Sequence, residues 1–205
     1  MGEGMAYSDF TTLSNLTRQF SLILQEETDL FATVSDQPAS EFLTNTLQDN
    51  VSLALAIDTE KARSEMIVAP ILIELKKQFK GQISLFSGIA FNVDIEQGLN
   101  GICDFLISQS SEQLFVVAPV ITIVEAKNDN IKSGLGQCVA EMVAAQLFNE
   151  REGNSISTVY GVVTTGSHWK FLKLIDKTVF VDLTEYYLKE INKILGILAQ
   201  PLSKV

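Results

Sequence analysis

The hydrophobic residues of this chain change their spacing several times along its length. In the first third they recur every three or four positions, which is the period of a helix with one buried face. That spacing predicts an amphipathic helix over residues 7–31 and one or two short helices over residues 36–57. A further helical stretch is predicted over residues 58–80, where Pro70 either kinks the helix or stands in the first turn of one that begins later.

After this helical part, strand and helix signals alternate. Strands that alternate with helices are typical of the α/β class, and we predict a three-layer α/β/α sandwich around a mixed central sheet. The predicted elements are strands over residues 82–93 and 100–108, a buried strand that ends near Val124, a helix over 131–149, a hairpin of 158–165 and 169–175, a short strand at 179–181, and a last helix after the capping-box sequence Asp182–Glu185.

Two registers are open for the strands on either side of residues 109–119. A tight turn within this segment would place Asp104 roughly 24 Å from Glu125, at ~3.4 Å per residue. If residues 109–119 form a wide connection and the strand resumes after Pro119, Asp104 instead falls opposite Glu125. Because proline cannot donate to a central ladder, a strand break at Pro119 is reasonable. We therefore predict the second register.

Three charged side chains stand at the end of this buried strand region. Side chains alternate faces along a strand, so Glu125 and Lys127 project together while Ala126 points away. Charges at the end of a buried strand need partners or a bound ion. With Asp104 as a second acid, this arrangement predicts a metal-dependent phosphodiesterase site. Glu65, at the head of the apolar stripe of residues 58–80, is either a fourth member or a first-turn acid that complements the helix dipole.

Charge divides the chain into two parts. Residues 1–60 contain ten acids and one base, so they account for −9 of the net charge of −10. Overall acidity argues against a high-affinity, free-standing nucleic-acid binder, but the remainder of the chain is almost neutral. We expect an acidic helical cap over residues 1–57 and a core domain over residues 58–205. Two cysteines, no apolar run long enough to span a membrane and no basic secretion signal predict a cytoplasmic protein without membrane contact.

Over residues 64–174 the chain resembles the PD-(D/E)XK superfamily of restriction-endonuclease-like nucleases. The resemblance rests on Glu65, on Gly101-x-x-Asp104, on Glu125-Ala126-Lys127 and on a following helix that bears Gln137. The hairpin from Gly161 to Trp169 also looks like that of bacterial members. Two positions depart from the pattern: Cys103 stands where the motif has proline, and Glu141 stands where one subgroup has tyrosine.

The resemblance implies a role for each matching residue. Asp104, Glu125 and the carbonyl of Ala126 would hold Mg²⁺ or Mn²⁺, for which hard oxygen ligands are suited. Lys127 would contact the scissile phosphate or orient the attacking water, and Glu65 would reach a metal-bound water. Gln137 and Lys132 are expected to contact the substrate, a nucleic acid with DNA ahead of RNA.

Two alternatives remain open. In the first, the charges are structural: Glu125 pairs with Lys127 or Lys132, and Asp104 caps a turn. In the second, the fold is kept without activity, and the chain is an interaction module that binds a protein partner through its acidic N-terminal region. The sequence does not distinguish an endonuclease from an exonuclease, and it leaves a homodimer open.

Overall fold

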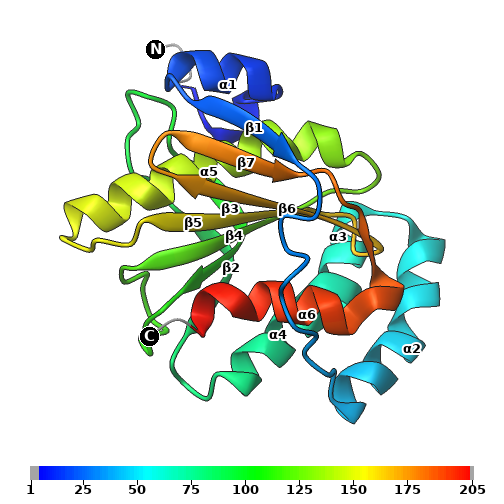
Figure 1. Cartoon of the computed structure of the whole chain (residues 1–205). Coiled ribbons are helices and arrows are strands. Elements are labelled where there is room, and N and C mark those ends of the chain that lie inside the picture. The colour runs from blue at the N-terminus through cyan, green and yellow to red at the C-terminus, as the bar shows by residue number, and fades with distance from the viewer. Residues whose placement is uncertain (1–4, 204–205) are drawn as a thin grey trace.

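The computed structural model describes residues 5–203, whose strands form a mixed eight-stranded sheet with helices packed against it (Figure 1). The strands are β1 (Ile23–Glu27), β2 (Ser84–Ala90), β3 (Ile102–Ser108), β4 (Val120–Ala126), β5 (Thr158–Thr164), β6 (His168–Ile175), β7 (Thr178–Asp182) and β8 (Tyr186–Tyr187). Their order is β1-β7-β6-β5-β4-β3-β2, with β8 paired to β6. The pairs β1–β7 and β4–β5 are parallel and the others are antiparallel. The chain is therefore an α/β protein, as predicted.

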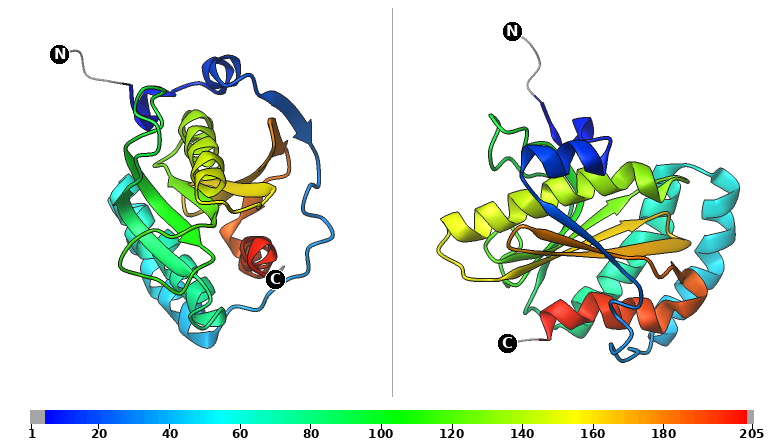
Figure 2. Two further views of the ribbon diagram at one scale, coloured as in Figure 1. Left: turned by 90° about the vertical axis from the view of Figure 1, so that its left-hand side faces the viewer. Right: turned by 45° about the horizontal axis from the view of Figure 1, so that its top comes forward.

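The helices lie on both faces of this sheet. They are η1 (Tyr7–Asp9), α1 (Leu13–Gln19), α2 (Glu41–Ile57), α3 (Glu60–Arg63), the π-helical turn η2 (Ser64–Val68), α4 (Ala69–Gln78), α5 (Ile131–Arg151), η3 (Leu188–Glu190), α6 (Ile191–Ala199) and η4 (Gln200–Leu202). In Figures 1 and 2, α1 and α5 cover one face, while α2, α4 and α6 cover the other. Within residues 5–203, no helix combines the length and the apolar character that crossing a membrane requires.

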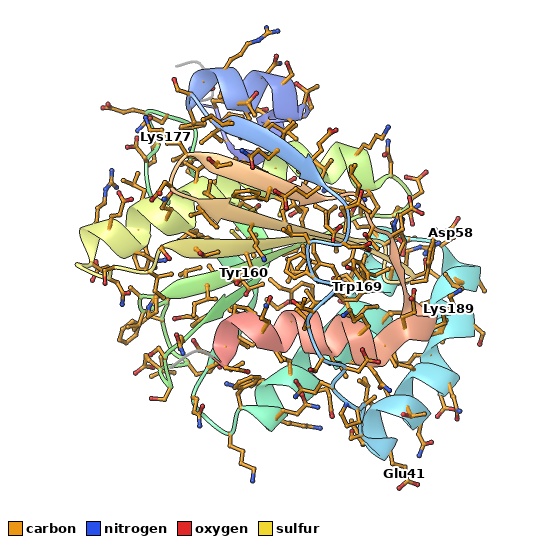
Figure 3. The ribbon with its side chains drawn as sticks, in the orientation of Figure 1. Glu41, Asp58, Tyr160, Trp169, Lys177 and Lys189 are labelled. Atoms are coloured by element: carbon orange, nitrogen blue, oxygen red, sulfur yellow. The ribbon has the colours of Figure 1, made fainter. Side chains whose placement is uncertain are left out.

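Each face of the sheet has its own hydrophobic core. The core under α5 includes Tyr7 and Leu16 from the N-terminal segment and Met142 from α5 itself. The core on the other face includes Leu43 of α2 and Trp169 of β6, which is labelled in Figure 3. A side chain in either core is removed from water by contacts from several elements, so both helical layers stabilise the same sheet.

The helix α5 connects the parallel strands β4 and β5, because a parallel pair needs a long crossover. It begins where the Asn130 side chain accepts a hydrogen bond from the backbone N–H of Lys132. At the other end, buried Asn149 bonds both backbone groups of Val120, with distances of 2.7 Å to its N–H and 2.8 Å to its C=O. The C-terminal part of the crossover helix is thus attached to the first residue of β4.

The helix predicted over residues 7–31 is wrong. The segment contains η1 and the short α1, and then β1, which adds to the sheet beside β7. Ser21 between them has a φ of 53°, which interrupts the helical path. Backbone pairing with β7 decides the conformation here, because all five side chains of β1 are exposed and their pattern carries little information.

The last helix begins later than predicted. The capping-box interpretation of Asp182–Glu185 is wrong, since Asp182 accepts hydrogen bonds from the Thr184 N–H and the Tyr186 hydroxyl instead. Residues 186–187 form β8, and α6 starts only at Ile191. Elsewhere the elements follow the prediction: residues 41–57 form one helix, and residues 60–78 form a continuous helical stretch with Pro70 at the start of α4.

Residues from the N-terminal third enter both cores. Tyr7, Phe10 and Leu16 lie in the core under α5, and Phe31 and Leu43 lie in the other core. Between them the chain runs along the outside of the sheet edge, from the α1 side to the α2 side, as Figure 2 shows. This segment is more than a helical cap, since β1 belongs to the sheet; a domain boundary near residue 57 stays a prediction.

Candidate functional site

The register of β3 and β4 brings the two predicted acids to facing positions. Phe105 pairs with Val124 and Leu106 pairs with Ile123 in an antiparallel ladder, so Asp104 stands across from Glu125. The Asp104 Oδ2 atom accepts a hydrogen bond of 2.8 Å from the backbone N–H of Ala126. The predicted wide connection and strand break are therefore confirmed, because β4 begins only at Val120.

Glu125 and Lys127 form an ion pair at the end of β4. The Lys127 Nζ also donates to the Gln137 Oε1 of α5, with 3.5 Å between the two atoms. The lysine stem lies against α5 at Gly134, where an added Cβ would come within 3.1 Å of Lys127 Cγ and 2.7 Å of Val163 Cγ1. A larger residue at 134 would therefore displace the lysine, so this glycine leaves room for the Lys127–Gln137 contact.

Burial controls the protonation of the three charged groups. For Glu125, burial and then the neighbouring charge of Asp104 raise the pKa to about 8, although Lys127 opposes the shift. Burial also raises the pKa of Asp104, against the Ala126 hydrogen bond and Lys127. Burial works against the charge of Lys127, but the Glu125 carboxylate outweighs it, so the lysine pKa is raised. The pair keeps one unsatisfied oxygen: Glu125 Oε2 is buried and has no hydrogen-bond partner among the described residues.

A hollow of about 330 Å³ opens beside Asp104. Its lining comes from α3, the π-helical turn, β2 and the strand ends: Glu60, Lys61, Ser64, Glu65, Ser87, Gly88, Asp104 and Ala126. Glu65 thus shares a hollow with Asp104, but its side chain is 62% exposed and pairs with Lys61 at 3.6 Å. Glu125, Lys127, Gln137 and Lys132 do not line this hollow, and Lys132 is exposed in the first turn of α5.

Two acids near this site were not predicted from the sequence. Glu60 lines the hollow, and its charge acts on both Glu125 and Lys127. Its place directly after the N-cap Thr59, five residues before Glu65, was the only sign of it in the sequence. Glu141 is fully buried in α5 and accepts a 3.1 Å hydrogen bond from Gln137 Nε2. Its spacing of four residues from Gln137 is visible in the sequence, but its burial is not.

The donor atoms suit a hard divalent cation. No group of three or more histidine, cysteine, aspartate or glutamate side chains within residues 5–203 is close enough together to hold a metal ion. Mg²⁺, however, is commonly bound through one or two carboxylates, keeps several waters and takes further oxygens from substrate phosphates. Asp104 and the unpartnered oxygen of Glu125 supply such a pair. The two carboxylates have the chemistry for such an ion, but of the two only Asp104 lines the hollow, and the free oxygen of Glu125 is buried.

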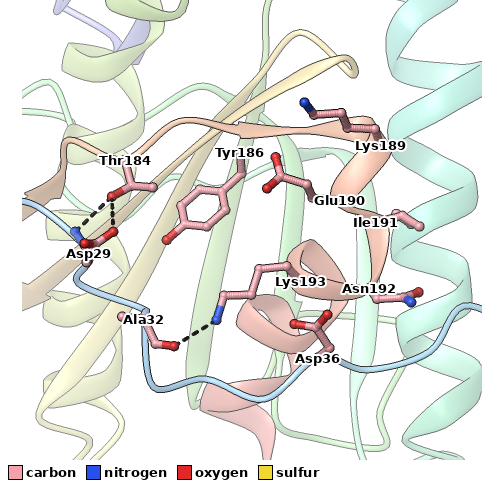
Figure 4. Close-up of a pocket in the computed structure, with 10 residues that line it drawn as sticks. All are labelled: Asp29, Ala32, Asp36, Thr184, Tyr186, Lys189, Glu190, Ile191, Asn192 and Lys193. Atoms are coloured by element: carbon pink, nitrogen blue, oxygen red, sulfur yellow. Dashed lines mark hydrogen bonds between the residues drawn. The ribbon is translucent and has the colours of Figure 1, made fainter.

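A second hollow, of about 470 Å³, lies between the segment after β1 and the start of α6 (Figure 4). Its polar groups already bind one another within the protein. Thr184 bonds Asp29 at 3.0 Å, and Lys193 donates to the backbone carbonyl of Ala32. These contacts attach the N-terminal segment to the C-terminal part of the chain, so we assign this hollow a structural role.

The comparisons with known proteins add no further support for the site. The sequence matches none of the protein-family models against which it was compared, and it matches no curated protein. The assignment of Asp104, Glu125 and Lys127 therefore rests on their geometry and chemistry alone: two facing carboxyl groups, an unpartnered buried oxygen and a lysine beside them.

Proposed function

We propose that this chain is a metal-dependent nuclease that hydrolyses phosphodiester bonds, with Asp104, Glu125 and Lys127 at its site. The proposal includes the finer fold assignment, a three-layer restriction-endonuclease-like sandwich. The observation that carries it is the β3–β4 register, which sets Asp104 across from Glu125 at the end of buried strands with Lys127 two residues on. A purely structural interpretation accounts for Lys127 through its ion pair and for Asp104 through its hydrogen bond with the Ala126 N–H, but it leaves the buried, unpartnered Glu125 Oε2 unexplained.

Each residue has a role that follows from its contacts. Asp104 and Glu125 offer carboxylate oxygens to Mg²⁺ or Mn²⁺, and the Ala126 carbonyl is a further oxygen in the same place. When bound, such an ion lowers the pKa of a coordinated water and neutralises charge on the phosphate. Lys127 supplies a positive charge to the phosphate oxygens, and its contact with Gln137 orients it. Glu60 and Glu65, on the wall of the hollow, are in place to accept hydrogen bonds from water.

We propose a nucleic acid as the substrate, with DNA ahead of RNA, contacted by Gln137 and by the exposed Lys132. The acidity of the chain favours modest affinity, because few cations are available to neutralise phosphates. Because few phosphates would be neutralised, few counterions would be released, and the affinity is expected to fall only gradually as salt concentration rises.

The proposal is tested with purified protein, single- and double-stranded DNA and RNA, and Mg²⁺ or Mn²⁺. We expect cleavage that EDTA abolishes. Asp104→Asn should lower kcat/KM at least about 100-fold, because the variant lacks a proposed metal ligand. Each tenfold loss corresponds to ~1.4 kcal/mol of transition-state stabilisation. Lys127→Met should lower kcat by a similar factor while the protein remains folded. Glu125 can take up a proton once its partner is gone, which limits the loss of stability.

Asp182→Asn is the matched control for Asp104→Asn. Asp182 is a buried aspartate at the end of β7, while Asp104 is half-buried within β3, and Asp182 accepts two hydrogen bonds remote from the site. The Asp182→Asn variant should be less stable, but each folded molecule should keep the metal-dependent cleavage activity of the wild type. The proposal fails if no substrate is cleaved and calorimetry detects no binding of Mg²⁺ or Mn²⁺. A loss of stability in Lys127→Met as large as its loss of activity would instead favour a structural ion pair.

The rival is a catalytically silent module that binds a protein partner through the N-terminal region. One observation favours it: α2 exposes Phe42, Leu53 and Ile57 on a segment rich in acids. Exposed apolar residues of this kind are found at protein interfaces. Absence of cleavage and of metal binding, in the experiment above, would leave this rival as the better proposal.

A further inference from the structure

Glu141 is a carboxyl group in a place where an apolar residue would pack without cost. It is completely buried in α5, the helix that also contributes Cys138, Met142 and Ala145 to the core on that face. Its Oε1 atom accepts a hydrogen bond from Gln137, while its Oε2 atom has no partner in the described part of the chain. Replacing a buried charged group by an apolar one is commonly neutral or stabilising, so packing alone does not explain an acid at this position.

A chain of contacts links this acid to the site. Glu141 Oε1 accepts from Gln137 Nε2 at 3.1 Å, and Gln137 Oε1 accepts from Lys127 Nζ at 3.5 Å. Lys127 in turn pairs with Glu125. Within residues 5–203, Gln137 is the one α5 side chain that forms a hydrogen bond with Lys127.

The orientation of the Gln137 amide decides whether Lys127 Nζ faces an accepting oxygen or a donating NH₂ group. A glutamine side chain has an accepting oxygen and a donating NH₂ group, and a lysine ammonium can only donate. An acceptor at Glu141 draws the NH₂ group toward itself, so the oxygen is left to face Lys127. Without that acceptor, the amide is free to turn its NH₂ group toward the ammonium, which gives no hydrogen bond.

We propose that Glu141 is a positioning residue, which orients the amide of Gln137 and thereby holds Lys127 at the site. The role of that lysine in catalysis rests on the proposed function, but the positioning itself does not. Burial and then the neighbouring Glu125 raise the pKa of Glu141 well above its usual range, while its Oε1 oxygen accepts a hydrogen bond from Gln137. A glutamine at 141 keeps such an oxygen, whereas a methionine of similar length does not.

The first test is independent of activity. The rate at which sulfo-N-hydroxysuccinimide acetate labels the Lys127 amine is measured by peptide mass spectrometry, relative to Lys61, whose side chain is 82% exposed. We expect Glu141→Met to change the Lys127 rate at least threefold, because its Nζ loses an ordered acceptor. Glu141→Gln should stay within twofold of the wild type.

Glu74→Met is the matched control. Glu74 is likewise a buried helical glutamate that accepts from a glutamine four residues away, Gln78, at 3.1 Å. It also binds Ser40 at the start of α2, far from β4 in sequence. This variant should lose stability without altering the labelling of Lys127, which separates a general loosening of the fold from a loss of positioning.

The second test uses cleavage. Glu141→Met should lower kcat by about 10–100-fold, as losing a residue that orients a ligand commonly does. Glu141→Gln should restore most of it. If Glu141 acts through Lys127, adding Glu141→Met to Lys127→Met should cost little more, a non-additivity that independent sites do not show.

The outcomes separate this proposal from the proposed function. Unchanged Lys127 labelling in Glu141→Met overturns the positioning role, as does equal change in the methionine and glutamine variants. If the wild type cleaves nothing, the nuclease proposal fails, yet the labelling ratio still decides the role of Glu141. Should Glu141→Met fail to fold, Gln137→Met breaks the same chain at a half-buried position and must give the same labelling change.

Discussion

At the residue scale, the site is a cluster of acids that share too few positive charges. Glu125 and Glu141 are both buried, each has one unpartnered oxygen, and Lys127 is the one cation that contacts Glu125 in the described chain. Burial raises the pKa of both carboxyl groups, because an ionised carboxylate is expensive to bury, and at Glu125 the charge of Lys127 offsets only part of this shift. A divalent ion would therefore compete with protons for Glu125.

These raised pKa values make the stability of the protein depend on pH. Between about pH 5 and pH 8 the folded protein keeps a proton on Glu125 that the unfolded chain releases near the ordinary value of 4.5, and burial raises the pKa of Glu141 in the same direction. The folded state then binds more protons, so the free energy of unfolding falls as pH rises, by up to about 1.4 kcal/mol per pH unit for each group.

Glu141→Gln should remove one of these contributions. Urea unfolding in EDTA at pH 5, 6, 7 and 8 is expected to give a shallower fall for the variant than for the wild type. The variant should gain relative stability as pH rises, since it has no proton to lose. Parallel curves for the two proteins would show that Glu141 is already ionised in the folded state or releases its proton outside this range.

At the element scale, α5 holds the site because it is attached to β4 at two ends. Near the site, Gly134 lets Lys127 lie against the helix, and at the far end Asn149 completes the hydrogen bonding of Val120. The second attachment gives the backbone of Val120, the first residue of buried β4, two hydrogen bonds with Asn149 in addition to its pairing with Ser108 of β3. Two attachments fix both the height and the direction of the helix over the sheet.

Asn149→Ala should therefore cost about 2–4 kcal/mol of unfolding free energy. The change leaves the buried N–H and C=O of Val120 without partners, and each unsatisfied group costs about 1–3 kcal/mol. Chemical denaturation measures the loss. Asn50→Ala is the control, since Asn50 makes one half-buried hydrogen bond, to Met66, and should cost less. Equal losses in the two variants would contradict the attachment at Val120.

At the scale of the whole molecule, the N-terminal third is built into the fold. The strand β1 extends the sheet beside β7, and the segments on either side of it enter opposite cores. The acidic character of this third is carried on its outer surface, where Glu26 and Glu27 are exposed. The N-terminal third therefore contributes apolar side chains to both cores and negative charge to the surface of the same folded unit.

Deletion of residues 1–57 should prevent cooperative folding of the remainder. It would expose apolar surface on both faces of the sheet, because Tyr7, Phe31 and Leu43 are each nearly inaccessible in the full chain. Thermal unfolding followed by circular dichroism, beside the full chain, tests this expectation. A sharp transition in the fragment 58–205 would instead establish the domain boundary near residue 57.

The elements that the sequence predicted well are those whose signals are local. The hairpin β5–β6 has a Gly-Ser turn between two apolar runs, and α5 has an unbroken helical period. The facing of Asp104 and Glu125 also followed from one local fact, the inability of Pro119 to take part in a central ladder. The roles of Glu65, Gln137 and Lys132 stay predictions.

The elements that the sequence missed depend on distant neighbours. Residues 23–27 form a strand because β7 offers its edge, although their apolar spacing continues that of a helix. Asp182 caps no helix because the Tyr186 hydroxyl binds it instead. In the sequence, Glu141 only stood where one nuclease subgroup has tyrosine. Its burial, visible only in the structure, is what suggests a positioning role.

The sequence by itself determined the α/β class, the strand that carries Glu125 and Lys127, and its register with Asp104. It could do so because hydrophobic period and proline act through the backbone at short range. Only the tertiary structure decided that β1 completes the sheet, that Glu60 shares the hollow with Asp104, and that Glu141 reaches Lys127 through Gln137. Burial and side-chain contact between separate elements exist only once those elements have packed together.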